Sequence, residues 1–104
     1  MITVLTTSVL TAFGRYDYRP VSLAAARALV ADGVQSTIGH QATAELLTEL
    51  LGVPVPVNRT DYVQSPGEQA LIFKLAQRLP EGVVLSREQL EARGYTLGVL
   101  ERLA

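Results

Sequence analysis

Short apolar runs alternate with longer helix-like segments along this chain. The runs are rich in valine, isoleucine and leucine, as the strands of a buried sheet are. We predict that five of them are strands, in residues 2–6, 34–38, 53–59, 70–75 and 95–103. Pro54 and Pro56 restrict the third strand to an edge of the sheet, because proline cannot donate a backbone hydrogen bond.

Three segments between these strands have the composition and the terminal residues of helices. The first follows a good N-cap, Ser22, and covers residues 23–32. The second covers residues 40–51, where leucines recur with helical spacing. The third is a brief helix that a capping box at residues 86–89 opens and Gly94 ends.

The order of these elements is strand, helix, strand, helix, strand, strand, helix, strand. It predicts one α/β domain, residues 1–104, with a mixed sheet of about five strands flanked by helices. Residues 60–69 and 78–82 are predicted to be a loop and a turn, and residues 6–20 a loop or a short hairpin.

Composition excludes several classes of function. The chain has 9 basic and 10 acidic side chains and a net charge of -1, which does not favour binding to long nucleic acid. It has no cysteine, so disulfides, zinc-thiolate sites and cysteine nucleophiles are excluded. No apolar run is long enough for a membrane span and no secretory signal precedes the first strand, so we expect a cytoplasmic protein.

His40 is the only histidine and lies where a strand turns into a helix. Backbone N–H groups and the positive end of the helix dipole make such a turn a ready site for an anion. An imidazole beside a bound phosphate can donate a proton to a leaving alkoxide, and RNA supplies its own nucleophile, the 2′-hydroxyl. The alternative is that His40 is a surface or capping residue. No acidic cluster accompanies His40 at ligand spacing, so we expect neither a metal nor a cofactor.

Other polar residues have simple structural interpretations when each is taken alone. Loop tyrosines can stack on bases but are common in any surface loop. The further residues are a solvated Arg59, a turn salt bridge between Arg78 and Glu81, turn residues Thr6 and Ser8, and a solvent-facing Lys74.

Over nearly its whole length, this chain resembles the small viral ring-nuclease family. These are the type III anti-CRISPR proteins of archaeal viruses and bacteriophages, which also have bacterial relatives. The resemblance is carried by TVLTTSVLT (3–11), STIGHQATAELLTELLG (36–52), VPVPVNR (53–59), LIFKLAQRLPEG (71–82) and the closing GYTLGVLERL.

The resemblance implies a fold, an assembly and an activity. The fold is a mixed sheet flanked by helices, and the assembly is a homodimer. The activity is metal-independent cleavage of cyclic tetra-adenylate to linear di-adenylate with a 2′,3′-cyclic phosphate, which silences type III CRISPR signalling. A cyclic tetranucleotide can have two-fold symmetry, so it fits the axis of such a dimer.

The resemblance also assigns roles to individual residues. His40 matches the catalytic histidine, and Glu81 matches a carboxylate that orients its ring and favours the protonated form. Arg59 and Arg78 match arginines that contact the phosphates, for which a guanidinium fork is well suited. Ser8 matches a serine in the floor of the ligand site.

Two implied ligand contacts depart from the family pattern. Lys74 stands where some members have glutamine, and Thr6 where many have asparagine. Two other functions stay open: a non-catalytic sponge or sensor for a cyclic oligonucleotide, and a small DNA-binding or structural protein, which the net charge disfavours. Residues 60–69 are a candidate lid over the ligand.

Overall fold

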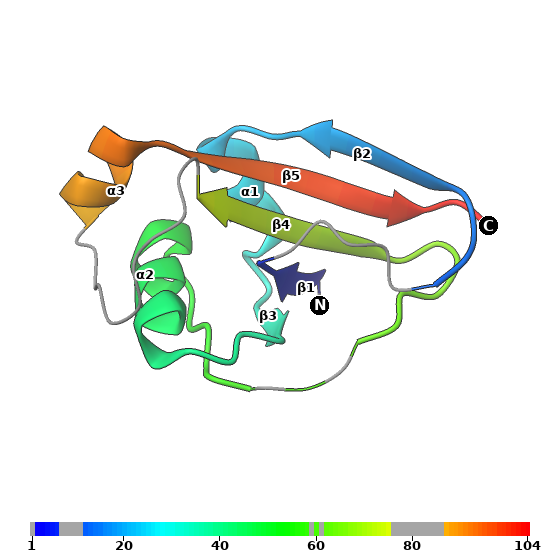
Figure 1. Ribbon diagram of the computed structural model, residues 1–104, viewed down its shortest axis with the longest axis horizontal. Helices are drawn as coiled ribbons and strands as arrows, with labels where there is room; N and C mark the ends of the chain where they lie inside the picture. Colours follow the sequence, from blue (N-terminus) through cyan, green and yellow to red (C-terminus); the bar gives the residue numbers. More distant parts are fainter. Residues whose placement is uncertain (1, 7–11, 59, 61, 76–86) are drawn as a thin grey trace.

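A computed structural model describes residues 2–6, 12–58, 60, 62–75 and 87–104 (Figure 1). Its strands and helices follow one another as β1 (Ile2–Leu5), β2 (Tyr16–Pro20), α1 (Leu23–Leu29), β3 (Val34–Ser36), α2 (Gln41–Leu51), β4 (Gln69–Leu75), α3 (Arg87–Arg93) and β5 (Tyr95–Arg102). The predicted turn at residues 78–82 and the first residue of the capping box, Ser86, lie outside the described residues.

The strands form one mixed sheet. Their order across the 5-stranded sheet is β2-β5-β4-β1-β3. Strand β1 pairs in parallel with both β3 and β4, whereas β5 is antiparallel to both of its neighbours, β4 and β2. Figure 1 shows β5 running against its two neighbours, β2 and β4. The predicted fold class, a small α/β domain with a mixed sheet of about five strands flanked by helices, is confirmed.

One predicted strand is wrong and one strand was missed. Residues 53–58 join no ladder of the sheet. Their backbone instead bonds to α2 and to the turn before it: the Val55 N–H donates to the Thr48 hydroxyl at 2.9 Å, and the Asn58 N–H donates to the Ile38 carbonyl at 2.8 Å. The edge strand is β2, in which polar and aromatic residues alternate along YDYRP and which pairs with β5.

The helix ends agree with the sequence signals except at one place. The Ser22 hydroxyl accepts from the Ala25 N–H at 3.1 Å, as an N-cap should, but α1 ends at Leu29 and does not continue through residue 32. Helix α2 ends at Leu51, and the next residue, Gly52, has φ +76° and therefore adopts the left-handed conformation that closes a helix.

The core lies mainly on the face of the sheet that the helices cover. Alternate residues of β4 divide between two clusters, as the strand pleat requires. Leu71 and Phe73 pack with the helices, together with Val4, Ala26, Leu47, Leu50, Leu90, Leu97 and Val99. The opposite face carries a smaller cluster that contains Leu5, Ala70, Ile72 and Leu100.

Gly98 permits a close packing contact on this second face. A Cβ atom added there would lie 2.5 Å from Cε1 of Tyr18, so the tyrosine ring covers the glycine. We expect Gly98→Ala to lower the free energy of unfolding by about 1 kcal/mol, because the ring must move. In a Tyr18→Ala background the same change should instead stabilise by about 0.5 kcal/mol, since glycine is unfavourable within a strand.

Chemical denaturation of the two single variants and the double variant measures this coupling. Additive effects of the two substitutions would contradict the proposed contact between Tyr18 and Gly98.

Candidate functional site

A small hollow opens where the carboxyl ends of parallel strands meet. Strands β1, β3 and β4 run in the same direction, so the residues that follow them lie at one edge of the sheet. Ligands commonly bind at this edge in open α/β sheets. The hollow has a volume of about 130 Å³ and is lined by Thr6, Ile38, Gly39, His40, Thr43, Phe73 and Leu75.

The turn before α2 is fixed by side-chain hydrogen bonds. The Ser36 hydroxyl accepts from the Ile38 N–H at 3.1 Å, and the Asn58 amide donates to the Ser36 carbonyl at 2.9 Å. The Thr37 hydroxyl donates to the Val4 carbonyl at 2.9 Å, which ties the turn to β1. These bonds set the position of His40, the residue that begins the helix.

His40 is the N-cap of α2 and has an extended backbone, with φ -123° and ψ 130°. Its side chain is exposed and makes no capping hydrogen bond, so the imidazole is not engaged by its own helix. The N–H groups of the first helical turn have no carbonyl partner within the helix and concentrate positive partial charge there. The predicted location of His40, between a strand and a helix, is confirmed, and the binding of an anion there stays a prediction.

Thr6 and Thr43 line the hollow together with His40. Thr6 was expected to contact a ligand and is exposed directly after β1. Thr43 was not anticipated from the sequence. Since it lies three residues after the N-cap, it shares a face of the helix with His40, and this spacing is the signal that identifies it.

Lys74 does not reach the hollow within one chain. Phe73 and Leu75 line the hollow, and successive strand residues point to opposite faces, so Lys74 points to the face away from it. A ligand contact from Lys74 would have to be made across that other face. The remaining expected site residues, Ser8, Arg59, Arg78 and Glu81, lie outside the described residues.

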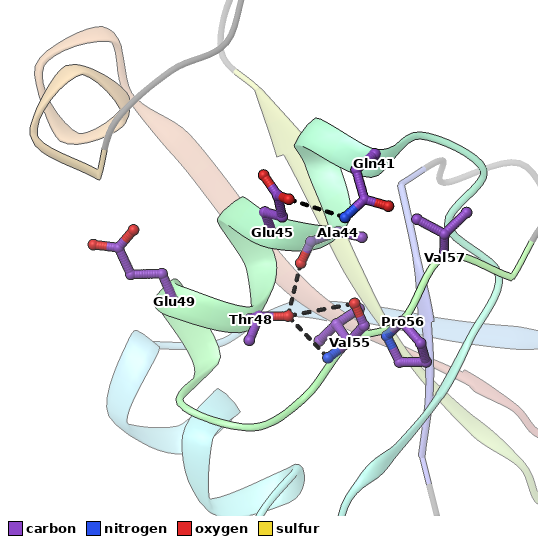
Figure 2. A pocket seen from close by; sticks show the side chains of 8 residues that line it. All are labelled: Gln41, Ala44, Glu45, Thr48, Glu49, Val55, Pro56 and Val57. Atoms are coloured by element: carbon purple, nitrogen blue, oxygen red, sulfur yellow. Dashed lines mark hydrogen bonds between the residues drawn. The ribbon is translucent and has the colours of Figure 1, made fainter.

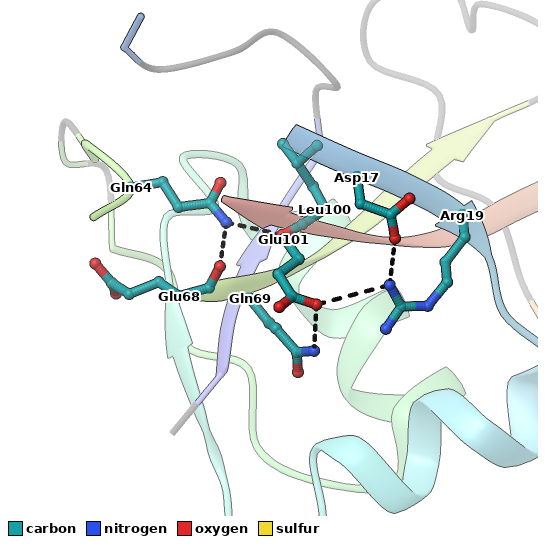
Figure 3. A network of polar contacts seen from close by, with 7 residues as sticks. All are labelled: Asp17, Arg19, Gln64, Glu68, Gln69, Leu100 and Glu101. Carbon is teal, nitrogen blue, oxygen red and sulfur yellow. Dashed lines mark hydrogen bonds and ion pairs between the residues drawn. The ribbon is translucent and has the colours of Figure 1, made fainter. Parts of the chain in front are cut away.

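The described part of the candidate lid is anchored far from His40. The amide of Gln64 is fully buried and donates to the carbonyls of Glu68 and Leu100, at 2.6 and 2.8 Å (Figure 3). Arg102 donates to the Gln64 carbonyl, and the Gly67 N–H donates to the Arg102 carbonyl. These contacts lie at the end of β4 that begins with Gln69, opposite the hollow, so this segment does not suit a lid over His40.

Two ionisable groups in the same segment are perturbed. Burial raises the pKa of the Tyr62 hydroxyl above its ordinary value. The Ser65 N–H donates to the carboxylate of Glu68 at 2.7 Å and holds the pKa of that group below its ordinary value. These bonds stabilise a turn, and neither group lines the hollow that His40 lines.

A second, wider groove runs along the outer side of α2 (Figure 2). Its volume is about 320 Å³, and residues 55–57 form its other wall. Among the described residues that line it, the ionisable ones are Glu45 and Glu49. The Gln41 amide donates to the Glu45 carboxylate at 2.9 Å. Two carboxylates repel a phosphate, so an anionic ligand is better accommodated by the hollow beside His40.

The described parts of the chain contain neither a cluster of metal-ligating side chains nor a membrane-spanning helix. No three histidine, cysteine, aspartate or glutamate side chains gather there as a metal site would require. None of the helices described is both long and apolar enough to cross a membrane.

Similar sequences come from archaeal viruses and from a bacterium. Protein ORF117 of Acidianus two-tailed virus is 46% identical over 69 residues, which cover 65% of this chain and 59% of that protein. YddF of Bacillus subtilis (strain 168) is 38% identical over 69 residues, which cover 66% of this chain and 64% of that protein. The matched part therefore spans about three fifths of these relatives.

A solved structure has the same fold. B116 of Sulfolobus turreted icosahedral virus superposes with a TM-score of 0.74 and covers 98% of this chain and 100% of its own. At 22% identity this likeness concerns the fold alone. The family model described as STIV B116-like matches residues 2–97, and the chain therefore belongs to the STIV B116-like family.

Proposed function

We propose that the protein is a ring nuclease that cleaves cyclic tetra-adenylate without a metal ion and so silences type III CRISPR signalling in the cytoplasm. The observation that carries this proposal is the placement of His40. Its exposed imidazole stands at the N-terminus of an 11-residue helix, beside a hollow at the carboxyl ends of parallel strands. The resemblance to ring nucleases supplies the substrate and the roles of residues outside the described parts of the chain.

The reaction is an internal transesterification. The ribose 2′-oxygen attacks the adjacent phosphorus, and the bond from phosphorus to the 5′-oxygen breaks. The 2′-hydroxyl loses its proton to solvent, and His40 donates a proton to the departing 5′-oxygen. The products of one cut are a 2′,3′-cyclic phosphate and a free 5′-hydroxyl, so no external nucleophile or cofactor is needed.

Electrostatic groups would stabilise the phosphorane as its charge develops. The first-turn N–H groups of α2 and the positive end of the helix dipole lie beside His40. Arg59 and Arg78 are proposed to bind the phosphates, and Glu81 to orient the protonated imidazole. Such preorganised groups are commonly a large part of enzymatic rate enhancement.

The size of the hollow supports a shared site in a homodimer. At about 130 Å³ it is smaller than the roughly 300–1,000 Å³ of pockets that enclose a small ligand. A cyclic tetranucleotide would therefore extend beyond one hollow. A two-fold axis through the ring would place two hollows at opposite phosphodiesters, so two cuts would give two di-adenylates.

The role of His40 can be tested with a changed leaving group. We expect His40→Ala to reduce cleavage of cyclic tetra-adenylate in EDTA by about 10²–10⁴-fold, because the 5′-oxygen then leaves unprotonated. A ring with sulfur in place of the scissile 5′-oxygens should restore most of the rate, since a thiolate leaves without an acid. Single-turnover product analysis by mass spectrometry measures both rates.

Gln41→Ala, at the next residue along the chain, is the matched control and should cleave both rings at the wild-type rate. Near-normal cleavage of unmodified cyclic tetra-adenylate by His40→Ala would contradict the acid role. If the wild-type protein binds unmodified cyclic tetra-adenylate and leaves it intact, the protein is a non-catalytic sponge.

The two-fold site predicts a specific intermediate in mixed dimers. We expect dimers formed from one wild-type and one His40→Ala subunit to cut only one bond and to release linear tetra-adenylate. Differently tagged subunits allow these dimers to be purified, and chromatography resolves their products. Direct formation of di-adenylate by the mixed dimer, or a monomeric protein by light scattering with and without ligand, would contradict the two-fold site.

The phosphate contacts predict a loss of affinity. We expect Arg59→Ala or Arg78→Ala to weaken binding of the ring by about tenfold to a hundredfold, as loss of a charge-assisted hydrogen bond would. Arg19→Ala is the matched control and should bind normally, because Arg19 lies on the edge strand β2, across the sheet from β3, and pairs there with Asp17 and Glu101. Calorimetry measures affinity, and unchanged binding by both variants would remove these contacts.

A further inference from the structure

We propose that the hollow beside His40 holds a nucleobase of the ring, with its flat face against Phe73 and Leu75, while the scissile phosphate lies outside at the start of α2. This inference rests on the proposed function and assigns the part of the ligand that the hollow accepts. It makes Leu75 and Thr6 determinants of binding, with no part in bond breakage.

The inner wall of the hollow is apolar and firmly held. Ile38 and Phe73 are almost fully buried, and Leu75 is partly buried and packs against the same core. The Phe73 ring lies 5.8 Å from the ring of Tyr95, measured between centroids, and this contact restrains it. A rigid apolar wall favours a flat heterocycle, because bases stack on aromatic and aliphatic surfaces regardless of sequence.

The outer rim of the hollow is polar but carries little charge. Thr6 and Thr43 contribute hydroxyls, and Gly39 contributes only backbone. A hydroxyl can donate or accept, so it can bond either kind of group on the edge of a base. His40 is the one ionisable residue among the described residues that line the hollow.

These two properties separate the base from the phosphate. A phosphate inside the hollow would lie against Ile38, Phe73 and Leu75, and burying an uncompensated charge among apolar groups is costly. Outside the hollow, the same phosphate meets solvent, the imidazole of His40 and the first-turn N–H groups. The volume of about 130 Å³ also suits one heterocycle better than a nucleotide with its sugar and phosphate.

Methyl NMR of the wild-type protein tests directly whether the hollow holds a base. The probe is cyclic tetra-adenylate with 2′-O-methyl groups, which lacks the nucleophile and stays intact. We expect the methyl resonances of Ile38 and Leu75 to show a ring-current shift on binding, while those of Leu103, an exposed leucine directly after β5, stay unchanged. Ribose 5-phosphate, which has no base, should move the His40 imidazole resonance without shifting these methyls.

A pair of variants gives an independent measurement. Leu75→Asn should raise KM for cyclic tetra-adenylate about tenfold, the order expected from one apolar side chain in contact with the ligand, and leave kcat near its wild-type value. Leu103→Asn is the matched control and should change neither constant. Thermal melting establishes whether both variants are folded. The NMR test uses the wild-type protein, so it applies even if Leu75→Asn does not fold.

The outcomes separate this inference from the proposed function. If the methylated ring binds but the Ile38 and Leu75 resonances do not move, the hollow does not hold a base. The ring-nuclease proposal would still stand. Equal methyl shifts with ribose 5-phosphate would also overturn the base-binding role of the hollow, because the hollow would then hold sugar or phosphate. If the protein neither binds the methylated ring nor cleaves the unmodified ring, both the proposed function and the base-binding role of the hollow are rejected.

Discussion

The parallel pairing of β1 with both β3 and β4 is the constraint on which the candidate site depends. In the register of these strands, Val4 lies between Ser36 and Leu71, so the three strands end at the same edge of the sheet. Thr6, the turn to His40, and Leu75 are far apart in sequence and meet there because of this pairing. An antiparallel β1 would send Thr6 to the opposite edge and leave no shared hollow.

Polar side chains convert this edge into a defined geometry. Ser36 and Asn58 bond the turn that leads to α2, and Thr37 bonds that turn to β1. Thr48 bonds Val55 from within α2, so the segment after the helix returns to the same turn. A hydrogen bond of this kind contributes modestly to stability, but an unmade one in a part-buried place is costly, so together they favour one position for the N-terminus of α2.

The sequence predicts the buried strands well because burial leaves a clear pattern. Strands β1, β4 and β5 carry apolar runs and were anticipated, as was the short β3, whereas β2 is mostly exposed and its aromatic and charged residues resemble a loop. Residues 53–58 mislead for the opposite reason. Their valines suggest a strand, but the two prolines lack donors, and the N–H groups of Val55 and Asn58 bond to Thr48 and Ile38. Local pattern does not reveal such competing partners.

The candidate site shows the same division between local and global information. His40 follows from its place between a strand and a helix, which the sequence displays, whereas Thr6, taken alone, has the interpretation of a turn residue and is assigned to the site only by the family resemblance. Thr43 requires knowledge that α2 begins at Gln41, and the direction of Lys74 requires knowledge of which face of β4 borders the hollow. Strand alternation shows that Lys74 and Leu75 differ in face, but only the packing of the helices shows which face each takes.

Local charge, and not the net charge of -1, decides where this protein can hold an anion. The carboxylates of Glu45 and Glu49 line the outer groove of α2, and those of Asp17 and Glu101 lie with Arg19 on β2 and β5, across the sheet from β3. Among the described residues, the hollow beside His40 has no carboxylate in its lining. A ligand with a few phosphates meets least repulsion at that edge, where the N-terminus of α2 also attracts it. A nearly neutral chain can therefore favour a small anion without the broad basic surface that a long polyanion would require.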